Sequence, residues 1–256
     1  MPSRTLRAQT AVAGIGETPY TRRGGSPDDE FKLALKAILA ACTDAGIDPR
    51  HIDGFASYSN DRSDPSRLAA ALGCRELRFA NMQWGGGGGG AAAAVGNAAA
   101  AIVSGMAECV VVFRALAQGQ HGRYGEGPGS VLDDTFDSHT LPYGMLSPAQ
   151  MFVMKYRRFA REHRIDPACL RAIAMASYRH AQSNPRAVMH GRPLDAQRYD
   201  TSRWIVEPWR LYDLCQESDG AAALVLVSAE RARDAMHAPC YLLAAAAGSP
   251  YRAGAP

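Results

Sequence analysis

The stretch from Leu77 to Phe113, LRFANMQWGGGGGGAAAAVGNAAAAIVSGMAECVVVF, decides the fold of this chain. It predicts a strand at Leu77–Asn81, then a helix of small residues that ends at about Ser104. The run Cys109–Phe113 has the continuous β-branched character of a strand that is covered on both faces. Six consecutive glycines, Gly85–Gly90, separate the first strand from the helix. This order of elements is typical of an α/β sheet.

The residues before this stretch continue the alternation of strand and helix. Ala8–Ile15 predicts a buried strand that ends in a turn. A helix follows, because Ser26–Pro27 supplies an N-cap and a proline at the first helical position, and it stops near Gly46. Phe55–Tyr58 predicts a short strand, and Pro65–Leu72 predicts a helix. The first part of the chain is therefore expected to form a doubly wound sheet.

The alternation of strand and helix patterns stops after Ala117. A loop that contains Gly, Asp and His leads into two amphipathic helices, at about 148–163 and 167–183, and non-sheet chain continues to about Pro208. So long a stretch between two strands predicts an inserted loop domain, which is a common place for substrate contacts. Ala221–Val227 then predicts another buried strand, and a short helix at 229–235 and a strand-like run at 241–247 follow.

Composition excludes several classes of protein. The chain has 256 residues, of which 47% are hydrophobic and 21% charged, so it belongs among globular proteins. A net charge of +3 is too small for the footprint of a nucleic-acid binder. The apolar stretch Gly85–Val103 is built of Gly and Ala and carries little transfer energy into lipid, so we expect no membrane span. The first seven residues show no apolar signal segment, and we expect a cytoplasmic protein.

The six cysteines lie far apart and form no Cys-x-x-Cys pair, so we expect neither a zinc knuckle nor a redox dithiol, and no metal site. Most of them are expected to be small core residues of a protein in a reducing compartment.

The glycine run is the strongest candidate for a functional feature. Backbone N–H groups at a helix start can point at a negative charge, and glycines let a ligand approach closely. Ordering glycine costs up to ~1 kcal/mol per residue relative to alanine, so packing alone does not explain six of them. The run contains the dinucleotide-binding pattern Gly-x-Gly-x-x-Gly, but any six consecutive glycines contain it. The pattern also needs an acidic residue at the end of the next strand, and Glu108 precedes that strand. Both points argue against a dinucleotide site. For the helix body, Ala91–Ala101, close packing is the favoured interpretation.

Several short segments spread over the chain match one family pattern. They are Val12–Tyr20 (VAGIGETPY), Asp44–Asp48 (DAGID) with Ile52–Gly54 (IDG), the glycine run with its alanine-rich helix, Pro142–Gly144 (PYG) with Pro148–Gln150 (PAQ), Asn184–Ala187 (NPRA) and Ser218–Ala223 (SDGAAA). On these residues the chain resembles the thiolase superfamily, specifically its sterol-carrier-protein-X-type and bacterial lipid-transfer-protein branch. The resemblance covers essentially the whole chain, but only the N-terminal half plus loop domain of a full thiolase.

The resemblance implies a thiolase-like α/β fold with a mixed, mostly parallel five-stranded sheet flanked by helices and an inserted loop domain. It also implies a homodimer formed through the third strand. The expected parts are a thiolase-like N-terminal core at 1–116, the inserted loop domain at 117–210, a return strand and helix that complete the core at 211–237, and the start of a truncated second half at 238–256.

Thiolases carry a nucleophilic cysteine at the start of the central helix, and alignment of this chain to that pattern puts Gly88 in its slot. The nearest cysteines, Cys74 and Cys109, fall elsewhere, so an acyl-cysteine intermediate is not expected at the usual place. This change resembles the lipid-transfer aldolases, which implies retro-aldol cleavage of a β-hydroxyacyl-CoA, often from a steroid. That reaction needs a base and donors for the departing enolate. The substrate is then a coenzyme A thioester, and no bound cofactor is expected.

The same resemblance implies that the base, often a tyrosine, lies in the C-terminal half of the family. It also implies that an OB-fold partner protein or a complementary thiolase half completes the enzyme. Two alternatives stay open. One is a thiolase-type acetyl-CoA acyltransferase in which a displaced cysteine serves, and the other is a noncatalytic acyl-CoA-binding or assembly subunit.

The candidate site residues are the following. Gly86, Gly87 and Gly89 are expected to bind the substrate around Gly88. His139 is a candidate acid, base or substrate contact, with a loop histidine bonded to backbone as the alternative.

Tyr143 is a further candidate for substrate contact. Arg186 and Arg192 flank a loop where coenzyme A phosphates could be held, with solvated surface arginines as the alternative. Asp219 is expected to be structural, since it turns the chain into a buried strand. The methionine cluster and the tryptophan pair are interpreted as packing, at Met145, Met151, Met154, Trp204 and Trp209.

Overall fold

The computed structural model describes residues 5–59, 61–84, 89–121, 141–145 and 147–248. The chain divides into two compact units. Among the described residues, the first unit holds those up to 117 and those from 218 to 248, and the second holds those from 118 to 217. The second unit extends past residue 210 because Tyr199 donates a 2.7 Å hydrogen bond to Asp213, which ties the 211–213 segment to it.

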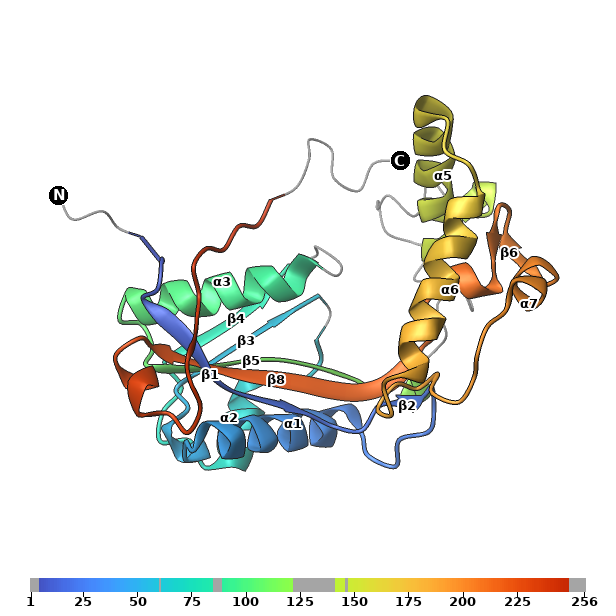
Figure 1. Cartoon of the computed structure of the whole chain (residues 1–256). Helices are drawn as coiled ribbons and strands as arrows, with labels where there is room; N and C mark the ends of the chain where they lie inside the picture. The colour runs from blue at the N-terminus through green and yellow to red at the C-terminus, as the bar shows by residue number, and fades with distance from the viewer. Residues whose placement is uncertain (1–4, 60, 85–88, 122–140, 146, 249–256) are drawn as a thin grey trace. The chain divides into compact units, whose positions relative to one another are not determined.

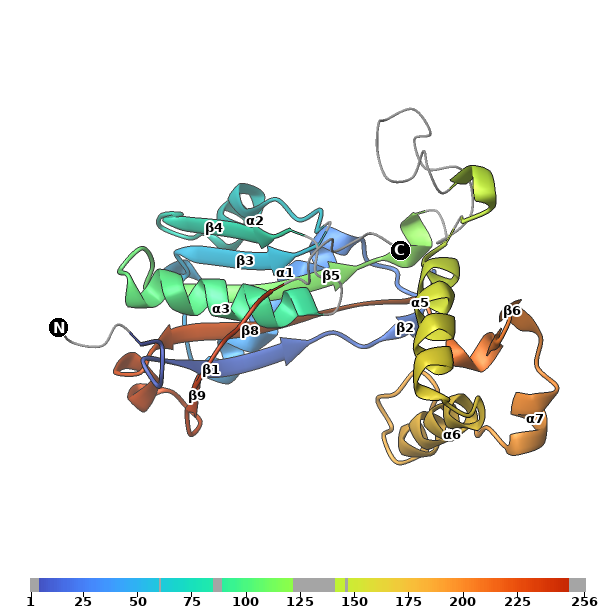
Figure 2. The same ribbon diagram turned by 90° about the horizontal axis from the view of Figure 1, so that it is seen from above.

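The first unit is built on one sheet (Figures 1 and 2). Its strands lie in the order β4 (Phe79–Gln83), β3 (Gly54–Tyr58), β5 (Cys109–Leu116), β8 (Ser218–Ser228), β1 (Thr10–Glu17) and β9 (Cys240–Tyr241), and β2 (Thr21–Arg22) pairs with β8. Strand β3 runs parallel to β4 and β5, whereas β8 is antiparallel to both β5 and β1. The expected mixed sheet is confirmed, with five long strands and two strands of two residues.

The expectation of a mostly parallel sheet holds only for β4, β3 and β5. It overlooked that β8, which returns from the second unit, inserts between β5 and β1 and pairs antiparallel with both. Parallel neighbours are usually joined by a helical crossover. The chain between β5 and β8 is instead the whole second unit, so β8 can enter the sheet in either direction.

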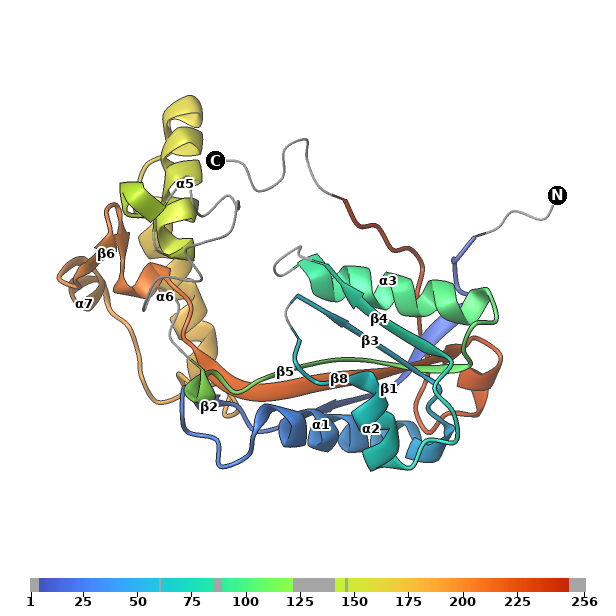
Figure 3. The same cartoon turned by 180° about the vertical axis from the view of Figure 1, so that it is seen from behind.

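Helices cover both faces of the sheet (Figures 1 and 3). Helices α1 (Glu30–Ala45) and α2 (Pro65–Leu72) pack on one face, around a core that includes Phe55, Val111 and Val225. Helix α3 (Gly90–Val103) packs on the other face through buried alanines. This three-layer arrangement confirms the expected α/β fold class.

The helix boundaries follow from capping residues. Asp29 caps α1 by accepting the Lys32 N–H at 2.7 Å, so the helix begins at Glu30, later than the Ser26 cap that the sequence suggested. Ser26 instead bonds within its own turn, to the backbone of Asp28. Gly46 ends the helix with a φ of 68°, a left-handed conformation that favours glycine.

Helix α1 and strand β1 touch backbone to backbone. A Cβ atom on Gly16 would lie 2.3 Å from the Ala37 carbonyl oxygen and from the Ala41 nitrogen. A Cβ on Gly14 would lie 2.5 Å from backbone atoms of Ala41 and Ala45. Glycine at both positions is therefore what lets the helix pack this closely on the strand.

The second unit contains α5 (Pro148–His163), α6 (Ala168–Gln182), α7 (Ala196–Asp200), β6 (Trp204–Val206) and β7 (Trp209–Arg210). Tyr156 packs on Trp209 with ring centroids 6.0 Å apart, and the Arg210 guanidinium lies 3.7 Å from the centre of the Trp204 ring. Both tryptophans therefore pack against neighbouring side chains, as the sequence suggested.

Two expected elements near the end of the chain are shorter than predicted. The helix expected at 229–235 is a 3₁₀ turn at Arg231–Asp234, and the strand-like run at 241–247 pairs only at Cys240–Tyr241. So short a segment does not offset the cost of nucleating an α-helix. Within the part of the chain that the structure describes, no helix is both long and apolar enough to cross a bilayer.

Candidate active site at the start of helix α3

The candidate site lies where β4 leads through the glycine run into α3. Strand β4 runs parallel to β3 and ends at Gln83, so the start of α3 lies beyond the carboxyl ends of these strands, and ligands of open α/β sheets bind at such ends. Residues 85–88 are outside the described residues, and these include the candidates Gly86, Gly87 and Gly88. The structure describes the end of the run, Gly89 and Gly90.

Gly89 is the N-cap residue of α3 and is exposed to solvent. Its φ of −71° and ψ of −18° suit any residue, and a Cβ atom there would meet nothing within 4 Å. Neither backbone strain nor packing requires glycine at this position. No side chain among the described residues caps the helix start, so its first backbone N–H groups are left for another acceptor.

Asn97 fixes the position of α3 against the end of β4. Its side-chain nitrogen donates to Asn81 Oδ1 at 2.8 Å and to Gln83 Oε1 at 3.2 Å. Sequence reasoning treated Asn97 only as an interruption of an apolar stretch. The signal was present in the alternation of Asn81 and Gln83, which places both amides on the same face of a strand.

The body of α3 is a packing surface. Ala94, Ala98 and Ala99 are fully buried, and Ala101 is nearly so. Ala94, Ala98 and Ala99 lie with Val110 and Leu226 in one cluster against the sheet. This agrees with the packing interpretation of the helix body.

The nearest cysteines lie away from this helix start. Cys109 opens β5, whose Val110 is paired with Gly54 at the amino end of β3, and so it lies at the opposite end of the parallel strands from Gly89. Burial raises the pKa of the Cys109 thiol to about 12 and also raises the pKa of Cys74. A thiol with so high a pKa is a poor nucleophile near neutral pH.

The other sequence candidates fall in the second unit or outside the described residues. His139 lies outside the described residues. Tyr143 closes a 3₁₀ turn, Leu141–Tyr143, and is 89% exposed. Arg186 and Arg192 are both exposed and lie on one loop. In this loop the Arg186 N–H donates to Asn184 Oδ1 at 3.0 Å.

Asp219 has the structural role expected from the sequence. The residue is 2% exposed, and its Oδ2 accepts the N–H groups of Gly24 at 2.7 Å and Ser26 at 3.3 Å. The carboxylate thus holds the loop that leads from β2 toward α1 against the start of β8.

The chain is similar to two curated proteins over nearly its whole length. It is 41% identical over 251 residues to the steroid side-chain-cleaving aldolase of Thermomonospora curvata, and 36% identical over 249 residues to the 17-hydroxy-3-oxo-4-pregnene-20-carboxyl-CoA lyase of Mycobacterium tuberculosis. These matches cover 96% and 95% of this chain. Among solved structures, the "Ltp2-ChsH2(DUF35) aldolase" matches 96% of the chain with a TM-score of 0.87 and 39% identity.

These matches confirm the resemblance to the thiolase superfamily, in its lipid-transfer branch. Human mitochondrial 3-ketoacyl-CoA thiolase, at 16% identity and a TM-score of 0.65, shares the fold. A scan against protein-family models found no match. The chain spans 63% and 64% of the length of the two curated relatives and 62% of the matched aldolase chain.

Proposed function

We propose that this chain is the thiolase-like part of a carbon–carbon lyase that cleaves a β-hydroxyacyl-CoA, with a steroid or lipid side chain, by retro-aldol chemistry. The observation that carries the proposal is the run of six glycines in the slot where thiolases keep their cysteine. It occurs in a chain that is 41% identical to a steroid side-chain-cleaving aldolase. Retro-aldol cleavage uses no enzyme nucleophile, so the loss of sulfur at this place is compatible with activity.

The reaction balances without an additional reactant. A base takes the proton of the β-hydroxyl group, the oxygen electrons form a carbonyl, and the bond between the α and β carbons breaks. The electron pair of that bond passes to the thioester carbonyl as an enolate, and protonation of the α carbon releases a shortened acyl-CoA. The other product is a ketone or an aldehyde. The largest demand on the protein is stabilisation of the enolate oxygen.

We assign that task to the backbone around Gly88, with Gly86, Gly87 and Gly89 bordering the substrate. The open surroundings of Gly89 and the uncapped start of α3 support this assignment.

We assign His139 to acid–base chemistry or substrate contact. Tyr143, Arg186 and Arg192 then hold the coenzyme A thioester, and the exposure of these three side chains supports that role. The substrate enters as the thioester, and the proposal includes no bound cofactor.

The proposal includes two kinds of partner. The first is a subunit that completes the enzyme, an OB-fold protein or a complementary thiolase half, and the DUF35 protein named with the matched aldolase supports it. The second is another copy of this chain, paired through β4, which is the third of the strands expected from the sequence. In support, β4 is an edge strand with exposed Ala80, Asn81 and Met82. A cytoplasmic location is also proposed, supported by six free cysteines.

The test is product analysis with the complete assembly. The full-length protein, purified with whatever co-purifies, is incubated with β-hydroxyacyl-CoA esters that carry steroid or simple lipid chains, and products are followed by mass spectrometry. The expected result is stoichiometric release of a ketone or aldehyde and a shortened acyl-CoA. The lyase proposal fails if no such substrate releases a carbonyl product. Acetyl-CoA exchange abolished by thiol alkylation would identify an acyltransferase, and coenzyme binding without any cleavage would identify a noncatalytic subunit.

A further inference from the structure

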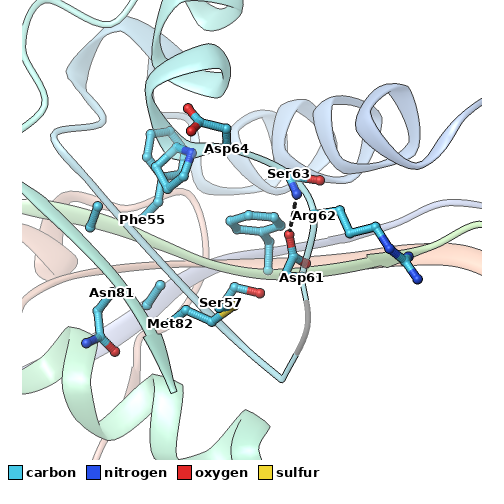
Figure 4. A pocket seen from close by; sticks show the side chains of 12 residues that line it. Phe55, Ser57, Asp61, Arg62, Ser63, Asp64, Asn81 and Met82 are labelled. Carbon is cyan, nitrogen blue, oxygen red and sulfur yellow. Dashed lines mark hydrogen bonds between the residues drawn. The ribbon is translucent and has the colours of Figure 1, made fainter. Parts of the chain in front are cut away.

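A pocket of about 380 Å³ opens on the face of the sheet that α2 covers, at the side of the edge strand β4 (Figure 4). Its floor is formed by β3 and β4, and its far wall by the segment 61–65 that leads into α2. Phe55 and Ser57 of β3 face the same side of the sheet as Met82 of β4, because Ser57 is paired with Met82 in the parallel register. This is the side opposite Asn97 and α3.

Three buried polar atoms in this pocket have no hydrogen-bond partner within the described residues. They are Ser57 Oγ, Ser63 Oγ and Asp61 Oδ2. The Ser57 hydroxyl lies close enough to the Asp61 carboxyl to oppose the rise in its pKa that burial causes. Ser57 and Ser63 are 5% and 6% exposed, and the Asp61 side chain is 3% exposed. Leaving a buried polar group unsatisfied costs about 1–3 kcal/mol. Three such groups around one pocket therefore indicate that an occupant completes their hydrogen bonds.

The charges around the pocket are already balanced. Asp61 Oδ2 lies 3.6 Å from Arg114 Nη1, and the same Arg114 nitrogen donates to the Tyr58 carbonyl oxygen at 2.6 Å. Behind the 61–65 segment, Arg62 pairs with Glu30 at 2.8 Å. Asp64, which also lines the pocket, accepts the Arg67 N–H at 3.0 Å and has the Arg67 charge near it. Each of these three carboxylates thus has an arginine near it, so the pocket has no net charge to offer to a cation or an anion. The occupant that fits this balance is neutral.

Much of the remaining lining is apolar, and its other polar members are Arg62, Asp64 and Asn81. Phe55, Phe113, Met82 and Pro65 contribute ring and aliphatic surface beside the three polar atoms. A pocket with apolar walls and a few convergent polar groups is typical of a small-molecule site. Its volume lies in the range that such sites have, about 300–1,000 Å³.

We propose that this pocket binds a neutral molecule that carries hydroxyl groups on an apolar frame. The frame lies against Phe55, Phe113 and Met82. One hydroxyl donates to Asp61 Oδ2, and a second exchanges hydrogen bonds with the hydroxyls of Ser57 and Ser63. The proposal uses only residues on the α2 face and does not depend on the lyase chemistry proposed above.

The test uses a cyclohexanediol with neighbouring hydroxyls as the probe. The full chain is labelled at its methionine methyl groups, and the diol is titrated while the Met82 methyl resonance is followed by NMR. A saturable shift with a dissociation constant of about 1–10 mM is expected for so small a ligand. The resonances of Met151 and Met154, in the second unit, serve as internal controls and stay in place.

Variants separate binding from general change. The double variant Ser57→Ala with Ser63→Ala is expected to weaken binding at least about fivefold, since it removes two hydrogen bonds of about 0.5–1.5 kcal/mol each. Ser66→Ala, at an exposed serine of α2 outside the pocket, is the matched control and keeps wild-type affinity. Circular dichroism checks folding, and if the double variant unfolds, Asp61→Asn decides by the same measurement.

Charged analogues test the claim of neutrality. Cyclohexanecarboxylate and cyclohexylammonium are titrated in the same way, and both are expected to bind more weakly than the diol. The proposal is overturned by a Met82 resonance that does not saturate, by equal affinity in the pocket variants and the wild type, or by an ammonium or carboxylate that binds more tightly. In the first case, ordered water alone completes the hydrogen bonds of the pocket.

Discussion

Glycine serves two different physical purposes in this chain. The two are distinguished by the atoms that an added Cβ would contact. At Gly14 and Gly16 a Cβ would penetrate the backbone of α1, so glycine there is required for folding. At Gly89 a Cβ would enter open space, and the backbone angles are ordinary. Nothing in the described residues requires glycine at this second kind of position, so we look for its purpose in what approaches the helix start.

Gly89→Val is predicted to lower lyase activity and to leave stability nearly unchanged. The added side chain has room in the folded protein, but it occupies space in front of the first N–H groups of α3. We expect kcat/KM to fall about tenfold to a hundredfold, as for a misplaced substrate. The melting temperature is measured in parallel.

The matched control for this change is Ala100→Val, at an exposed position of the same helix away from its start. This variant should keep wild-type activity. A Gly89→Val protein that is unfolded, or one that is fully active, would contradict the role assigned to Gly89.

In the native protein, exposed cysteines are predicted to be alkylated faster than buried ones. Burial raises the pKa of both Cys42 and Cys109 to about 12, so at about pH 8 almost none of either thiol is ionised. Cys215 and Cys240 are exposed and should react first with iodoacetamide. Peptide mass spectrometry before and after unfolding measures the order of labelling.

Unfolding in urea is the control, because it should make Cys42 and Cys109 as reactive as the exposed pair. Fast native labelling at Cys109 would contradict the buried position. If it also removed an exchange activity, it would revive the acyltransferase alternative.

Asp61 is predicted to make stability fall as the pH rises. Burial raises the pKa of its carboxyl, and the backbone N–H of Ser63 and the charge of Arg114 oppose this shift. The folded state therefore holds the proton more tightly than the unfolded state. The stability linked to that proton is complete below the unfolded pKa, about 3.9, and is lost as the pH rises through the folded pKa.

Asp61→Asn has no proton to lose at this position. The free energy of unfolding of the wild type should thus decrease relative to that of the variant as the pH rises from about 4 toward neutrality. Urea denaturation of both proteins across this range measures the difference. A difference that stays constant, or that changes in the opposite direction, would show that Asp61 is not a buried carboxyl.

Among the elements, the close contact of α1 with β1 depends on the absence of a Cβ atom at Gly14 and Gly16. Gly16→Ala is predicted to reduce the free energy of unfolding by about 3 kcal/mol, because the new methyl group meets the Ala37 oxygen and the Ala41 nitrogen at 2.3 Å and forces the helix away. Chemical denaturation gives the value. The matched control is Gly89→Ala, a substitution of the same size in open space, which should cost almost nothing.

The elements also show where local sequence is informative and where it is not. The alternation of apolar runs, caps and glycines predicted the helices at 30–45, 65–72 and 148–163 to within a few residues. It did not predict that β8 lies between β5 and β1, because Ala221–Val227 is equally apolar for any neighbour in the sheet. Strand order is set by long-range pairing, and a short buried run carries no information about its partner.

At the candidate site the same division holds. The glycine run and the helix start were visible in the sequence because they are consecutive residues. The clamp of Asn97 on Asn81 and Gln83, and the pocket that joins Ser57, Asp61 and Ser63, were not visible, because each depends on which face of β3 or β4 a side chain occupies. Asp53 is a similar case, since its carboxylate accepts the N–H groups of residues 108 and 109, far along the chain.

At the scale of the whole molecule, the edge strand β4 is the proposed place of association with a second copy. One side of β4 is paired with β3, and no strand among the described residues pairs with the other side, where Ala80 and Met82 are exposed. Unprotected edges of this kind pair with another strand, and natural monomers block them with lysine. The proposed homodimer through β4 uses this edge and needs no further element.

Ala80→Lys is therefore predicted to convert the dimer to monomer. In a symmetric pairing through β4, both copies place the new charge at the same interface, and like charges held together weaken association by at least about tenfold. Sedimentation velocity over a range of protein concentrations measures the shift. Ala172→Lys, at an exposed position on α6, adds the same charge elsewhere and should leave the dimer intact. A wild-type protein that sediments as a monomer at every concentration, or an Ala80→Lys protein that remains dimeric, would exclude association through this edge.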